Sequence, residues 1–158
     1  MRYGSILLIA TVALGTCAPG QETSGKLSES EIALVRSDIQ TETTAILQQN
    51  LTLSDGQART FWPLQRSYQS DLARLGDERL DVLREYAKNW HDLSDETAKG
   101  LGKRLLKYHK KRVDLQSKYF ERMSKAISPS VAAKVFQIEM QMEDMIDLEI
   151  ASSVPLIK

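Results

Sequence analysis

The sequence has almost no cysteine: Cys17 is the only one among 158 residues. A chain with one cysteine cannot form an internal disulfide or supply the thiolates of a structural zinc site. Its two histidines, His91 and His109, have no second histidine or glutamate at the spacing of a helical metal site. We therefore expect no cofactor. A weak surface metal site at His91 with Asp92 or Asp95 stays open.

The chain also lacks net charge, because 21 basic residues balance 21 acidic ones. Loss of a leader that contains Arg2 would leave a net charge of about −1. Without an excess of positive charge we expect no binding to nucleic acid. The sequence contains no Gly-x-Ser-x-Gly elbow, phosphate-binding loop or dinucleotide fingerprint. These observations argue against an enzyme.

Aromatic residues make up only 6% of the chain, and there are only four prolines. The core must therefore consist mostly of aliphatic side chains and methionine. Three of the prolines lie at or near places where a helix could begin or end, which favours long helices over sheets.

Residues 1–18 resemble a secretory leader. Arg2 is followed by an apolar run from Ile6 to Leu14, which is shorter than the ~20 residues of a spanning helix. Cys17 ends a Leu-Gly-Thr-Cys segment that resembles a bacterial lipobox, with Thr16 as a departure from it. We expect a periplasmic protein, either cleaved near Gly15 or Gly20 or tethered to the outer membrane by a lipid on Cys17. Membrane contact is expected only through that lipid.

After a polar tether at residues 19–27, apolar periodicity and capping signals predict helices at about 28–49, 54–91, 94–127 and 129–152. Ser28 with Glu31 and Ser54 with Gln57 form capping boxes. Ser94 opens the third helix, and Ser128 with Pro129 opens the fourth. Pro63 should kink the second helix, and a break at Gly76 is an alternative.

Each predicted helix has one apolar stripe. The stripes, in chain order, comprise Ile32, Val35, Ile39 and Ile46; Phe61, Leu64, Tyr68, Leu72, Leu75, Val82 and Tyr86; Leu101, Leu105, Tyr108, Leu115, Tyr119, Met123 and Ile127; and Val131, Val135, Ile138, Met142 and Met145. Short connections make neighbouring helices antiparallel. The fold class is therefore all-α, with long antiparallel hairpins that form a four-helix bundle or cradle within residues 28–158.

The segment Leu53-Ser54-x-x-Gln57 resembles the Leu-Thr-x-x-Gln signature of the Spy/CpxP-like periplasmic helical proteins. A second copy would be residues 127–131, where Val131 replaces the glutamine. Phe-Trp-Pro at 61–63 and Phe-Gln-Ile-Glu at 136–139 resemble a proteobacterial branch of that group. The resemblance implies a curved, often dimeric helical cradle that holds unfolded envelope proteins or senses metal stress.

The strongest local charge feature is the basic run at 103–112. Beside the Leu105/Tyr108 stripe it suggests a surface for acidic clients or lipid headgroups. We also assign Met140 to a client or partner surface because we expect it to be exposed. The proposed surface residues are Lys103, Arg104, Lys107, Tyr108, Lys110, Lys111 and Met140. The alternative is a solvated helix face balanced by Glu139, Glu143 and Asp147. Arg79 and Arg112 interrupt apolar stripes, and we expect each either to snorkel toward solvent or to pair with an internal carboxylate.

Three functions remain open at this stage. The first is a chaperone-like binding protein for unfolded or stressed envelope proteins. The second is an accessory lipoprotein that docks on one defined partner. The third is a weak metal-binding or metal-resistance protein.

Overall fold

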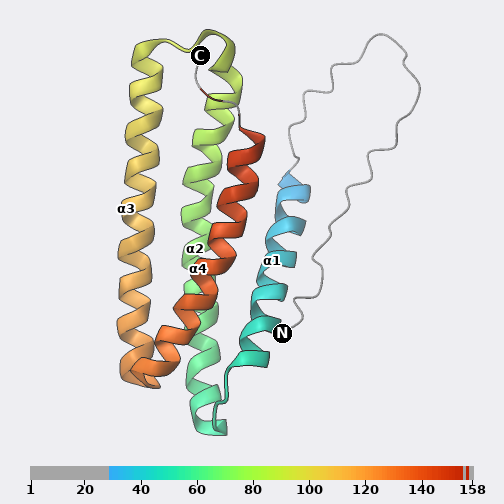
Figure 1. The fold of residues 1–158 in the computed structure, drawn as a ribbon, viewed down its shortest axis with the longest axis vertical. Coiled ribbons are helices and arrows are strands. Elements are labelled where there is room, and N and C mark those ends of the chain that lie inside the picture. Colours follow the sequence, from blue (N-terminus) through green and yellow to red (C-terminus); the bar gives the residue numbers. More distant parts are fainter. Residues whose placement is uncertain (1–28, 155, 157–158) are drawn as a thin grey trace, which may run out of the picture.

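The computed structural model describes residues 29–154 and 156 of the chain. Within them it contains four α-helices: α1 (Glu29–Asn50), α2 (Asp55–Asn89), α3 (Asp95–Ala126) and α4 (Pro129–Ser153). A short 3-10 helix, η1 (Trp90–Asp92), follows α2. Consecutive α-helices run in opposite directions, and α4 crosses in front of α2 (Figure 1). This confirms the expected all-α bundle of antiparallel hairpins. The proposed leader, tether and Cys17 lie outside the described residues.

The helix starts follow the predicted capping signals. The Ser54 hydroxyl accepts a hydrogen bond from the Gln57 backbone N–H, and the Gln57 side chain accepts one from the Ser54 N–H. Ser94 and Ser128 cap α3 and α4 by accepting hydrogen bonds from the backbone N–H groups of Thr97 and Val131. The box expected at Ser28 and Glu31 lies outside the described side chains.

Helix α2 is continuous through both positions where a disruption was expected. Pro63 lies within it and Gly76 does not break it. Pro63 is exposed, so the carbonyl that loses its helical partner can be hydrated rather than buried. The alternative of a new helix at Asp77 is therefore wrong.

The main core lies where α2, α3 and α4 meet the end of α1. Tyr68 packs edge-on against Tyr119 and Phe136, with ring centroids 5.4 and 5.3 Å away. The fully or nearly fully buried members of this core are Leu47, Phe61, Tyr68, Tyr119, Met123, Ala132, Val135 and Phe136. Helix α4 thus covers the inward faces of α2 and α3, so these faces do not form an open cradle.

Two predicted stripe positions are wrong. Val35 is 51% exposed, because the buried side of α1 continues from Ile32 to Thr43 and Leu47. Met145 is 48% exposed, because the buried stripe of α4 continues from Met142 toward Ile146.

Helix α1 is attached differently from the other three. The most extensive helix contacts are between α2 and α3 and between α3 and α4, whereas α1 mainly contacts α4. Leu47 anchors it in the core, and Arg36 pairs with Asp77 of α2 at 2.6 Å. Between these anchors α1 and α2 leave a groove, which is described below.

Candidate functional site

The basic run of α3 separates into two parts in the structure. Arg104 and Lys111 turn toward α2 and form ion pairs with Glu85 and Glu78. Lys103, Lys107 and Lys110 lie on the exposed side of α3. For Lys103 and Lys107 no ion pair occurs within residues 29–154, whereas Lys110 contacts Asp114 at 3.2 Å.

The apolar residues beside these lysines are not the ones that were predicted. Tyr108 is only 4% exposed and so is not part of the proposed surface. It lies on the inward side of α3, near the guanidinium groups of Arg79 and Arg112. On the exposed side, Leu106 is 71% and Val113 is 58% exposed.

We call Lys103, Leu106, Lys107, Lys110 and Val113 the α3 outer face. Lys110 is four residues from Leu106 and three from Val113, so it lies next to both on the helix surface. This face combines positive charge with uncovered apolar area. Met140 is 54% exposed as expected, but it lies on α4 and not on this face.

The acids of α4 pair with Arg112 at the end of the basic run but do not balance the α3 outer face, so the alternative interpretation is correct only for Arg112. Glu139, Glu143 and Asp147, which we call the α4 carboxylate row, point inward instead. Asp147 pairs with both Arg79 of α2 and Arg112 of α3. The expectation that these two arginines pair with internal carboxylates is therefore confirmed.

Glu139 is the most deeply buried member of the row, at 2% exposed. Gln65 donates a hydrogen bond to its Oε1 at 2.5 Å, and Gln69 donates to both of its oxygens at 2.8 and 3.0 Å. Burial raises the pKa of Glu139 to about 7, and the nearby charge of Glu143 acts in the same direction against the two amide hydrogen bonds. Sequence analysis missed Gln65 entirely.

The other two members of the row, Glu143 and Asp147, also form hydrogen bonds with side chains of α3. Gln116 donates to Glu143 at 2.8 Å. Burial raises the pKa of Glu143, and the charge of Arg112 opposes this. Burial acts to raise the pKa of Asp147 too, but the hydrogen bond and charge of Arg79 outweigh it and lower the pKa. The row therefore ties the three helices together through side chains with shifted pKa values.

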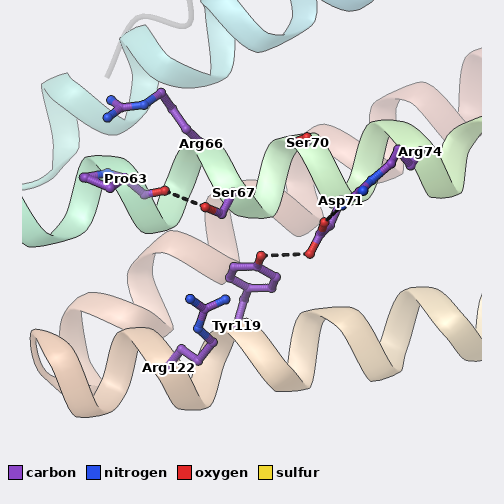
Figure 2. A pocket seen from close by; sticks show the side chains of 8 residues that line it. All are labelled: Pro63, Arg66, Ser67, Ser70, Asp71, Arg74, Tyr119 and Arg122. Carbon is purple, nitrogen blue, oxygen red and sulfur yellow. Dashed lines mark hydrogen bonds and ion pairs between the residues drawn. The ribbon is translucent and has the colours of Figure 1, made fainter.

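A shallow groove of about 470 Å³ lies between α2 and α3, on the surface shown in Figure 2. The Tyr119 hydroxyl donates to Asp71 at 2.8 Å, and Arg74 also pairs with Asp71. These two hydrogen bonds hold the pKa of Asp71 below its usual range. Arg122 lies over the Tyr119 ring, 4.7 Å from its centroid. The groove thus contains several cations and one carboxylate, that of Asp71, which already has hydrogen-bond partners. Among its lining residues no nucleophile is in contact with a base.

A second groove, of about 750 Å³, lies between α1 and α2. Polar side chains from both helices line it, including Gln40, Thr44, Gln48, Gln65 and Gln69. Gln65 and Gln69, which form what we call the floor of this groove, are the two glutamines that donate hydrogen bonds to Glu139.

No group of three or more histidine, cysteine, aspartate or glutamate side chains suited to a metal ion occurs in residues 29–154. His91 lies in η1, with its ring 4.3 Å from that of Trp90. Nor does any described helix carry an apolar stretch long enough to span a membrane.

Comparison with known protein families, with curated proteins and with solved structures finds no match. The resemblance to the Spy/CpxP-like proteins therefore stays a prediction from the short motifs alone.

Proposed function

We propose that this protein is a non-enzymatic, chaperone-like binding protein that holds unfolded or stressed envelope proteins on the α3 outer face. The observation that carries the proposal is the exposure of Leu106 and Val113 among lysines that have few acidic partners. Isolated apolar residues on a surface are ordinary, but an apolar pair one heptad apart within a positive surface suits a specific class of partner.

That partner is a polypeptide segment with both acidic and apolar side chains. Burial of a leucine or valine side chain contributes roughly 1.5–3 kcal/mol. The lysines add long-range attraction, which accelerates association and weakens as salt screens it. Because each segment supplies few contacts, we expect weak and broadly selective binding.

The test is suppression of aggregation by the chain without residues 1–18, using an acidic protein that aggregates on heating as client. We expect suppression at equimolar amounts, with a decrease at high salt. The variant Leu106→Gln should lose much of the effect. No suppression by the unaltered chain at equimolar amounts would rule out the proposed function.

Helix α4 offers a matched control. Leu148 is 72% exposed, nearly the same as Leu106 at 71%, but its exposed neighbours on α4 include Asp144 rather than lysines. Leu148→Gln should therefore leave the suppression unchanged. Equal losses from both leucine variants would mean that apolar exposure alone, and not the α3 outer face, is responsible.

A further inference from the structure

The groove between α1 and α2 has the shape of a site for a linear ligand. Its α2 side runs from Trp62 to Asp77, fifteen residues along one helix face. At ~1.5 Å per residue this is about 22 Å. An extended polypeptide of about six or seven residues has the same length, at ~3.3 Å per residue.

The polar groups along the groove recur at a regular interval. On α1, Gln40, Thr44 and Gln48 are each four residues apart, and on α2 Gln65 and Gln69 have the same spacing. Four residues of helix advance by ~6 Å. Two residues of an extended chain advance by ~6.6 Å, and they bring equivalent backbone groups to the same side. Each side-chain amide can therefore meet one backbone amide group of such a chain.

The glutamines on the floor are already oriented. The Nε2 groups of Gln65 and Gln69 both donate to the Glu139 carboxylate, which leaves their Oε1 atoms as acceptors. Gln65 is 3% exposed, and its Oε1 has no hydrogen-bond partner among the described residues. A buried acceptor without a partner costs roughly 1–3 kcal/mol, so a small shift of the Gln65 amide that brings its Oε1 to a ligand N–H group would be favoured.

The charges at the rim favour an uncharged ligand. Three charged residues line the groove: Asp77 is paired with Arg36 and Arg74 with Asp71, so only Arg66 lacks an ion pair among the described residues. Trp62 is the one aromatic side chain of the groove and lies at one end of it. An oligosaccharide of this length would need aromatic rings at several points for stacking, whereas a peptide needs only one apolar contact.

We propose that the groove between α1 and α2 binds an extended, uncharged polypeptide segment whose backbone amides pair with the glutamines of both helices. The site is separate from the α3 outer face and differs in ligand, because it recognises backbone groups rather than acidic side chains. The experiments that test this site therefore do not depend on whether the proposed function is correct.

The test uses Trp62 as a reporter in the full chain. The only other tryptophan is Trp90, so Trp90→Phe leaves the groove residue as the sole tryptophan. The probe is a blocked octapeptide of alternating serine and valine, titrated to about 1 mM, which corresponds to roughly 4 kcal/mol of binding free energy. We expect a saturable change in fluorescence. An octapeptide that is N-methylated at alternate residues, and so lacks half its backbone donors, should bind at least about tenfold more weakly.

Two variants locate the site. Gln48→Met removes an amide of the α1 side without touching the core, and Gln69→Met removes one from the floor; each should weaken binding about tenfold. Gln141→Met, on the exposed side of α4, should have no effect, and circular dichroism checks that all three variants keep their helices. Absence of a saturable change, equal binding of the N-methylated peptide, or the same change with a neutral tetrasaccharide would overturn the proposal.

Discussion

Gln65 on α2 donates a hydrogen bond of 2.5 Å to Glu139 on α4, across 74 positions of sequence. Both side chains are almost fully buried, at 3% and 2% exposed. The carboxyl group of Glu139 is costly to ionise in this environment, and its two glutamine partners offset only part of that cost.

The first prediction concerns the pH dependence of stability. Because burial raises the pKa of Glu139 from 4.5 to about 7, its contribution is full below pH 4.5 and is lost as the pH rises through about 7. Glu139→Gln keeps an acceptor for both glutamines and removes the charge. At pH 8 it should raise the free energy of unfolding by up to about 3 kcal/mol.

Urea unfolding at several pH values checks this prediction. The difference between the two proteins should shrink toward zero as the pH falls to 4.5. Taking the difference removes the effect of His109, whose pKa is lowered by burial and by the charges of Arg112 and Arg79. A difference that does not depend on pH would contradict the assignment, and Glu121→Gln, at an exposed position of α3, should show no difference.

The second prediction concerns Asp147, which bridges Arg79 and Arg112. The two arginine side chains are only 15% and 17% exposed, and Asp147 is the carboxylate that both of them contact, although Arg112 also lies 3.7 Å from Glu143. Asp147→Asn should lower the free energy of unfolding by about 2 kcal/mol, between the ~1 kcal/mol or less of an exposed ion pair and the ~3–5 kcal/mol of a fully buried one. Asp114→Asn removes the exposed pair with Lys110 and should change it by less than about 0.5 kcal/mol. If Asp147→Asn lowers the free energy of unfolding by no more than Asp114→Asn does, the ion pairs of Asp147 add no measurable stability.

A third prediction tests the start of α2. Ser54→Ala removes one half of the capping box and should lower the free energy of unfolding by about 1 kcal/mol. Ser117→Ala, on the exposed side of α3, is the control and should leave the stability unchanged or slightly higher, because alanine favours helices. Thermal or urea unfolding measures both, and an unchanged stability of the Ser54 variant would show that the cap is dispensable.

The fourth prediction tests the hypothesis that Cys17 carries a lipid anchor. Expression in a Gram-negative host with a fatty-acid analogue should label the chain and bring it to the membrane fraction. Cys17→Ser should abolish both the label and the membrane association. A chain that is exported and unlabelled would remove the lipoprotein hypothesis without affecting the proposals for α3 or for the groove.

The buried stripes of α2 and α3 could be predicted because their periodicity is simple. Phe61, Tyr68, Leu75 and Val82 follow one another at seven-residue steps, and all four are buried. The capping residues of α2, α3 and α4 were also predictable, because a cap depends on local sequence alone.

The polar part of the interior was less predictable. Glu139 lies between Val135 and Met142 on the buried stripe of α4, and Gln65 lies between Phe61 and Tyr68 on that of α2. A polar residue at a stripe position was the available signal, but the partner is 74 residues away and no local pattern identifies it. The groove beside α1 depends in the same way on how α1 settles against α4.

The α3 outer face shows a related limit. The sequence analysis placed the apolar part of this surface at Leu105 and Tyr108, which the structure turns toward the bundle. Leu106 and Val113, seven residues apart, carry the exposed apolar area. A helix that has apolar residues on two sides offers two possible inward faces, and only packing against α2 and α4 selects one.

Site-specific photocrosslinking to a client tests the central claim most directly. A photoreactive benzoylphenylalanine replaces Leu106 in one protein and Leu148 in another, two leucines of nearly equal exposure on different helices. With an acidic, heat-unfolded client we predict crosslinks from position 106 that decrease at high salt, and few from position 148. Equal crosslinking from both positions, or none from position 106, would contradict the proposal that the α3 outer face holds clients.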